Sequence, residues 1–177
     1  MMYGLDHVLK GMYRDILQGP DGGVRHDSGW TSNTIVERCH ILLAGFMNND
    51  LTNGIQYLAV GQGDTAWDTP AGPPPSPATA TDLVNRFPET IPFDQLDLTY
   101  LDLNNEVVAG PTNRLQITAT LSEGFPTPPD DLNAYPLREF GLFGSFGGED
   151  YMINCIRHPV IHKDTASTLI RVVRLQF

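Results

Sequence analysis

The sequence is poor in cysteine, in basic residues and in long apolar runs. Its two cysteines, Cys39 and Cys155, are too few for a disulfide framework, so we expect free, buried thiols. Its 11 basic and 21 acidic residues give a net charge of −10, which argues against nucleic acid or an anionic membrane as the main partner. No run approaches the length of a transmembrane helix, and the N-terminus lacks the pattern of a signal peptide. A protein made in the cytoplasm, which stays soluble or joins an assembly, is expected.

Glycine and proline are abundant by contrast. The 17 glycines and 14 prolines in 177 residues favour many turns, and therefore short strands over long helices. Prolines cluster in residues 69–80 and 125–136, which we expect to be extended, exposed loops. The length suits a single β-rich domain over residues 1–177, with an N-terminal hairpin–helix segment at about residues 8–50.

Alternating apolar and polar residues dominate the second half of the chain. The clearest case is 114–121, where Leu115, Ile117, Ala119 and Leu121 alternate with polar residues. Strands are predicted at 55–60, 96–103, 114–121, 137–143, 151–157 and 168–177. The last strand has no fully polar face, so we expect it to be covered on both sides. The pattern predicts a mainly β fold, an antiparallel β-sandwich or an open barrel, with one main helix.

Residues 137–144 are predicted to form the central strand. One face would carry Arg138, Phe140, Leu142 and Gly144, and the other Leu137, Glu139, Gly141 and Phe143. The first face is apolar after its arginine and is expected to meet a core. Arg86, Arg138 and Glu139 are predicted to be structural charges, because a charge between apolar strands needs a partner across the sheet.

The first 50 residues are less regular. An apolar stripe in residues 8–17 fits a helix, but the turn signal of residues 19–23 favours a hairpin that joins residues 12–17 to 24–28. A helix at about 34–47 is predicted from its apolar face, with Thr34 and Glu37 as a capping box and Ser32 as a rival cap. Residues 80–86 are expected to make one helical turn.

Several residue groups resemble functional sites. His158 and His162 are four residues apart, but the intervening Pro159 predicts an extended chain, in which they are too far apart for one metal ion. Asp64 and Asp68 flank Trp67, as carboxylates flank an aromatic ring in some sugar and calcium sites, but a solvated turn fits them better.

Catalytic signals are weak. Glu149 and Asp150 could pair with Glu139 or Glu123 as in a glycosidase, although any chain offers such pairs. There is no recognisable nucleophile motif, and residues 61–63 are not followed by the helix that a phosphate loop requires. We therefore predict no catalytic residue, no metal site and no cofactor.

The order of the segments supports a family resemblance. The hairpin of residues 15–23 leads into residues 29–36, which read Gly-Trp-Thr-Ser-Asn-Thr-Ile-Val, and a helix follows. Then come residues 55–63, a proline-rich loop, residues 82–86, residues 137–144 and the final strand 169–177. This order is similar to that of small structural proteins of tailed bacteriophages: tail-fibre attachment, collar-fibre and baseplate-associated proteins.

The resemblance implies a virion protein without catalytic residues, assembled in the host cytoplasm as a symmetric homo-oligomer, a trimer or hexamer. Its partners would be other virion proteins of the tail, collar, baseplate or fibre, and neither nucleic acid nor a membrane. Low charge and long loops fit a subunit that buries large surfaces, and the aromatic residues in or beside the loops are the predicted interface anchors: Trp67, Phe125, Tyr135 and Phe146. The alternatives are a carbohydrate-binding β-sandwich centred on Trp67, for host adsorption, and a glycan-cleaving enzyme that uses Glu139 or Glu149.

Overall fold

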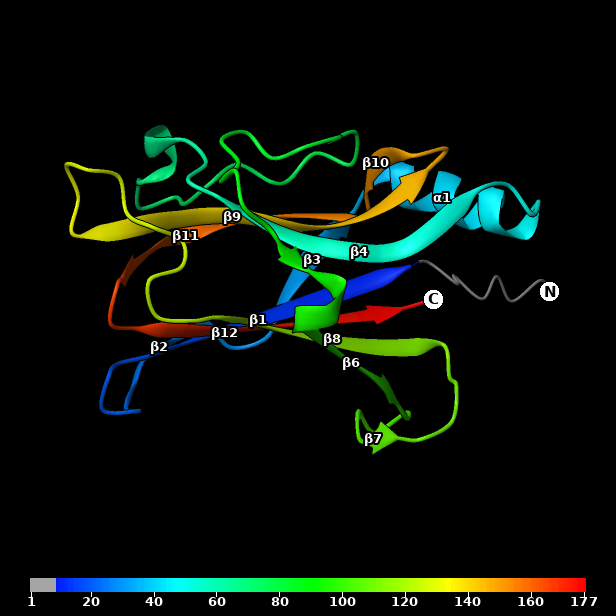
Figure 1. Cartoon of the computed structure of the whole chain (residues 1–177), viewed down its shortest axis with the longest axis horizontal. Helices are drawn as coiled ribbons and strands as arrows, with labels where there is room; N and C mark the ends of the chain where they lie inside the picture. Colours follow the sequence, from blue (N-terminus) through cyan, green and yellow to red (C-terminus); the bar gives the residue numbers. More distant parts are fainter. Residues whose placement is uncertain (1–8) are drawn as a thin grey trace.

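Antiparallel strands form two facing layers, with one α-helix beside the upper layer (Figure 1). The computed structural model describes residues 9–177; residues 1–8, where the predicted domain and hairpin–helix segment begin, lie outside it. The upper layer contains β5 (Ile91–Pro92), β4 (Thr52–Gly61), β9 (Ala134–Phe146), β10 (Glu149–Met152) and β11 (Asn154–Asp164). The lower layer contains β2 (Val24–Asp27), β1 (Lys10–Gln18), β12 (Thr168–Gln176), β8 (Arg114–Leu121), β6 (Leu96–Leu101) and β7 (Val107–Val108).

Strand β3 (Thr31–Ile35) joins the two layers. It pairs with β1 on one side and with β11 on the other. The sheet therefore runs continuously from β5 to β7, and in the part of the chain that is described these two ends do not pair to close a barrel. The predicted class, a mainly β antiparallel fold with one helix, is confirmed.

The main core lies between the layers. Ring centroids of Tyr13 on β1 and Phe140 on β9 are 5.5 Å apart with the rings edge to face, so this pair connects the two layers directly. Leu142 from above and Val173 from below are also fully buried in this core. Full burial of each such side chain contributes about 1.5–3 kcal/mol.

The central strand differs in detail from the prediction. β9 pairs with β4 and β11, as a central strand should. However, Leu137 packs in the same core as Phe140, although strict alternation places them on opposite faces. The partner strand β11 shifts register between Arg157 and Ile161, so the pleat is not regular where Leu137 pairs.

The helix α1 (Glu37–Met47) begins three residues later than predicted, and the capping box is wrong. Thr34 belongs to β3, where it pairs with Cys155, and the helix has no side-chain cap. Instead the Glu37 amide donates to the Ala78 carbonyl at 2.9 Å, so the proline-rich loop satisfies this helix end.

Other segments confirm or correct the sequence reading. The hairpin β1–β2 and strand 114–121 are confirmed, whereas the helical turn at 80–86 is wrong.

The final strand is covered on one face alone, and not on both as predicted. Leu169, Arg171, Val173 and Leu175 are buried, and the alternate residues stay partly exposed. The predicted strand 96–103 ends at Leu101, and 151–157 divides into β10 and β11. Strands β3, β5 and β7 were not predicted, and the 3₁₀ turns are η1 (Thr65–Trp67) and η2 (Phe93–Gln95).

Candidate functional site

Glu139 and Arg138 form hydrogen bonds and an ion pair with the loop of residues 62–87, on the outer side of the upper layer. The fully buried Glu139 carboxylate accepts the amides of Asn85 at 2.7 Å, Val84 at 2.9 Å and Gly63 at 3.2 Å. These bonds take up the amides that a helical turn at 80–86 would use, which explains why that turn does not form. The two charges thus connect the central strand to residues 62–87.

The guanidinium of Arg138 makes a two-pronged ion pair with Asp68. Its Nε and Nη2 donate to the Asp68 carboxylate at 2.8 and 2.6 Å, and its Nη1 donates to the Gln62 carbonyl at 2.9 Å. Hydrogen bonding from Arg138 lowers the pKa of Asp68. Arg86 is the third charge that was predicted to be structural. Its guanidinium carbon lies 4.9 Å from the ring centroids of Tyr57 and of Phe143.

The predicted sugar site around Trp67 is not an open platform. Trp67 is only 8% exposed, and the Arg157 guanidinium lies 4.8 Å from its ring centroid. Asp64 accepts the Ala66 amide at 2.9 Å as the cap of η1, and Asp68 is occupied by Arg138. These residues stabilise the loop, and a sugar ring has no free aromatic face to stack on here.

The other predicted interface anchors also pack within the chain. Tyr135 is buried, and both it and Phe125 contact Phe87 edge to face, with ring centroids 5.3 and 5.6 Å apart respectively. Phe146 stacks on Tyr151 at 5.5 Å. Phe125 and Phe146 keep some exposure, whereas Trp67 and Tyr135 leave little surface for a partner.

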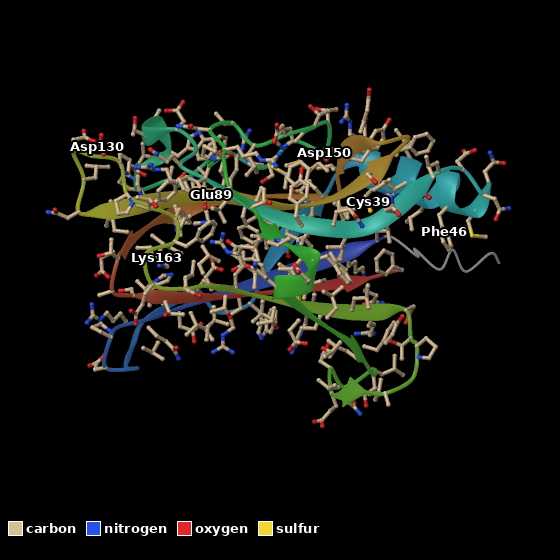
Figure 2. All side chains as sticks on the ribbon, in the orientation of Figure 1. Cys39, Phe46, Glu89, Asp130, Asp150 and Lys163 are labelled. Carbon is tan, nitrogen blue, oxygen red and sulfur yellow. The ribbon has the colours of Figure 1, made fainter. Side chains whose placement is uncertain are left out.

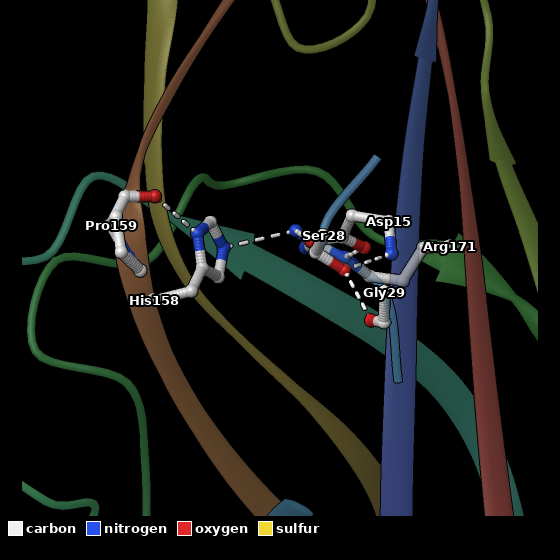
Figure 3. Close-up of polar contacts among 6 residues, drawn as sticks. All are labelled: Asp15, Ser28, Gly29, His158, Pro159 and Arg171. Atoms are coloured by element: carbon white, nitrogen blue, oxygen red, sulfur yellow. Dashed lines mark hydrogen bonds and ion pairs between the residues drawn. The ribbon is translucent and has the colours of Figure 1, made fainter. Parts of the chain in front are cut away.

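A buried polar cluster joins the two layers (Figure 3). Arg171 on β12 donates to the Asp15 carboxylate on β1 at 2.7 and 2.8 Å, and its Nη2 lies 3.0 Å from Nε2 of His158 on β11. The His158 Nδ1 lies 2.8 Å from the Pro159 carbonyl. A carbonyl only accepts and a guanidinium only donates, so the proton of His158 is on Nδ1 and the ring is neutral.

Burial and charge set the protonation of this cluster. Burial, with Arg171 nearby, lowers the pKa of His158 from 6.5 to about 4. Burial opposes the charge of Asp15, but the Arg171 guanidinium outweighs it and lowers the pKa of that carboxyl. The three groups pair with one another inside the core through Nε and Nη2 of Arg171, while its buried Nη1 has no partner within residues 9–177. The contacts link the two layers, as expected of a structural cluster. The sequence signal for it was a lone arginine on the apolar face of the last strand.

The residues that the sequence offered for metal binding and for catalysis do not come together in one site. His158 is buried in the cluster, whereas His162 is exposed on an extended strand, and within residues 9–177 no three His, Cys, Asp or Glu side chains gather as a metal site. The buried Glu139 holds three amides and cannot reach a polysaccharide, and Asp150 accepts the Tyr57 hydroxyl at 2.7 Å. No helix in the described part of the chain is long and apolar enough to cross a membrane.

An apolar region of the surface lies at the α1 end of the sandwich. Leu43, Phe46 and Met47 share one face of α1, since they are three and four residues apart, and Phe46 and Met47 are 68% and 78% exposed. Figure 2 shows Phe46 at the end of the molecule opposite Asp130. We use "the apolar end" for Leu43, Phe46, Met47, Leu51, Phe93 and Phe177, all exposed apolar side chains.

At the apolar end the core opens to the surface. A cavity of about 190 Å³ is lined by Leu43, Phe93 and Phe177 together with the core residues Leu42 and Leu175. Its walls come from α1 and β4 of the upper layer and from β8 and β12 of the lower layer. None of residues 9–177 covers the space between the layers on this side, which suits contact with another apolar surface.

No protein-family model, curated protein or solved structure matches this chain.

Proposed function

We propose that this chain is a structural subunit of a tailed-bacteriophage virion, in the tail, collar or baseplate, that forms a symmetric trimer or hexamer. In that role it would attach a fibre or a neighbouring ring protein. The single observation that carries the assembly function is the apolar end, where the core opens to the surface among the described residues, beside exposed side chains of α1. The order of the sequence segments supports the virion setting.

Apolar side chains that are exposed to water favour association, because a partner can cover them. Covering a Phe, Met or Leu side chain contributes about 1.5–3 kcal/mol, so several of them together can supply the association energy of a micromolar complex, about 8 kcal/mol. Phe46, Met47 and Leu51 retain most of their surface for such a contact. In a closed oligomer the same patch of each subunit is covered by its neighbours.

The test is the mass of the purified protein in solution, measured by light scattering over a range of concentrations. A trimer or hexamer is expected, and Phe46→Glu should shift the mass towards the monomer because a charge cannot be buried in an apolar contact. Val24→Glu is the matched control, since Val24 is also exposed but lies on β2, away from α1. It should leave the mass unchanged.

A monomer at every concentration would contradict self-assembly through the apolar end. So would an oligomer that survives Phe46→Glu with normal circular dichroism. The virion part of the proposal is tested separately, by mass spectrometry of purified particles of the encoding phage, and absence of the chain from the particles would contradict it.

A further inference from the structure

A second, larger cavity lies against the lower layer. It measures about 570 Å³ and is lined by residues of β1, β3, β6, β8 and β12. Strand pairing places Lys10 beside Gln176, Met12 beside Arg174, and Gln176 beside Arg114. These residues alternate with buried ones along their strands, so they face outward from the core.

The charge around this cavity opposes that of the whole chain. Lys10, Arg114 and Arg174 all line it, and its lining contains no Asp or Glu. None of the three forms a salt bridge with a carboxylate in the part of the chain that the structure describes. In a protein of net charge −10 with only 11 basic residues, three cations at one cavity, none paired with a carboxylate of residues 9–177, are a concentrated positive site.

Polar atoms in the cavity wall lack partners. The side-chain amide of Asn33 and the Nε of Arg114 are shielded from solvent and make no hydrogen bond within residues 9–177. Gly11 leaves room for the Asn33 side chain, because a Cβ at position 11 would clash with the Asn33 Oδ1. Unpartnered buried donors and acceptors are destabilising, and these side chains would have to turn towards the cavity before a polar ligand could satisfy them.

Arg174 is held in place for contact with an anion. Its Nε donates to the Gln116 side chain at 2.9 Å, and its guanidinium lies 4.0 Å from the centroid of the Trp30 ring. These contacts fix the plane of the guanidinium and leave its Nη edge for a ligand. Such a fork matches the two oxygens of a carboxylate or phosphate.

We propose that this cavity binds a small anionic carbohydrate, a sugar ring that carries a carboxylate or a phosphate. The cations bind the acidic group, while Ser32 and Asn105 offer hydrogen bonds to hydroxyl groups. Met12 and Leu101 supply an apolar wall, and the volume is in the usual range for a small-ligand site. This site goes beyond the proposed assembly function: Leu115 and Leu175 line both cavities, but the three cations line this one and not the cavity at the apolar end.

The experiment titrates the protein with three ligands that share one ring: glucuronate, glucose 6-phosphate and neutral glucose. Calorimetry on the unaltered protein should show binding of at least one anion and not of glucose, and the tighter anion identifies the acidic group. Trp67→Phe leaves Trp30 as the single tryptophan, so its fluorescence should change on the same titration. No binding of either anion at millimolar concentrations, or equal binding of glucose, would overturn the proposal.

Variants locate the site. Arg114→Gln and Arg174→Gln should each weaken binding at least about tenfold, the value of a charge-assisted hydrogen bond. Arg25→Gln is the matched control: Arg25 is exposed on β2, 3.8 Å from Asp164, and does not line the cavity. Equal weakening by Arg25→Gln, or none by either cavity variant, would overturn the assignment. Should Arg174→Gln disturb folding, Arg114→Gln decides alone. Light scattering measures self-assembly independently of ligand binding. A result against anion binding therefore leaves the proposed assembly function untouched, and the reverse also holds.

Discussion

Three residues from three strands determine how the layers meet. Asp15 and Arg171 belong to the lower layer and His158 to the upper one, yet Arg171 contacts both. Its guanidinium also lies 3.7 Å from the ring centroid of Phe140 on β9. A buried charge is tolerated only where partners replace its water, so this cluster fixes the position of each layer relative to the other.

Replacing Asp15 by Asn should test that dependence. The change leaves the Arg171 guanidinium buried without its carboxylate, and we expect a loss of about 3–5 kcal/mol in the free energy of unfolding, measured in urea. Asp27→Asn is the control, because the Asp27–Arg14 pair is exposed and should contribute little. Comparable losses in both variants would contradict a special role for the buried pair.

The protonation of His158 predicts a dependence of stability on pH. Its folded pKa of about 4 lies below its unfolded value of 6.5, so between these limits the unfolded chain binds a proton that the folded chain does not. Stability should fall by about 3 kcal/mol as pH falls from 6.5 to 4, and this contribution should then level off. Unfolding of His158→Gln should lack that slope, whereas the exposed His162→Gln should keep it. An unchanged slope in His158→Gln would contradict the assignment.

At the scale of elements, local patterns were predictable and distant pairings were not. Strand 114–121 shows its alternation within eight residues, and the structure places β8 over the same span. Thr34 and Glu37 also form a plausible local motif, but pairing with Cys155 retains Thr34 in a strand. The sequence near residues 80–86 contains no signal that the Val84 and Asn85 amides donate to Glu139, because Glu139 is more than 50 residues away along the chain. The cavity at Trp30 was missed for the same reason, since its cations come from separate strands.

The loop of residues 62–87 should depend on Glu139. Glu139→Gln keeps the size of the side chain but removes the charge and one of the acceptor oxygens, so an amide of Val84 or Asn85 loses its partner. We expect a loss of about 1–3 kcal/mol on urea unfolding and faster proteolysis within the loop. Glu149→Gln, at an exposed position of β10, should change neither. A loop that stays protected in Glu139→Gln would show that other contacts hold it.

At the scale of the whole molecule, the chain combines an apolar surface and a positively charged cavity with a large negative net charge. In the proposed oligomer the apolar end would form the contact between copies of the chain, while the net charge of −10 makes those copies repel one another. The cavity at Trp30 and Arg174 is locally positive and attracts anions. Salt screens both electrostatic effects but does not weaken the burial of apolar surface, so it should act on the two surfaces in opposite directions.

Raising the salt concentration at pH 8 should therefore strengthen self-association and weaken anion binding. Light scattering should show a higher oligomer fraction in high salt, because repulsion between the −10 subunits is screened while the contact of Phe46 and Met47 remains. Calorimetry with glucuronate or glucose 6-phosphate should show weaker binding under the same conditions. Phe46→Glu should stay monomeric at both salt concentrations, and Arg114→Gln should reduce the salt dependence of anion binding. Oligomers that dissociate as salt rises would indicate an interface made by ion pairs in place of the apolar end.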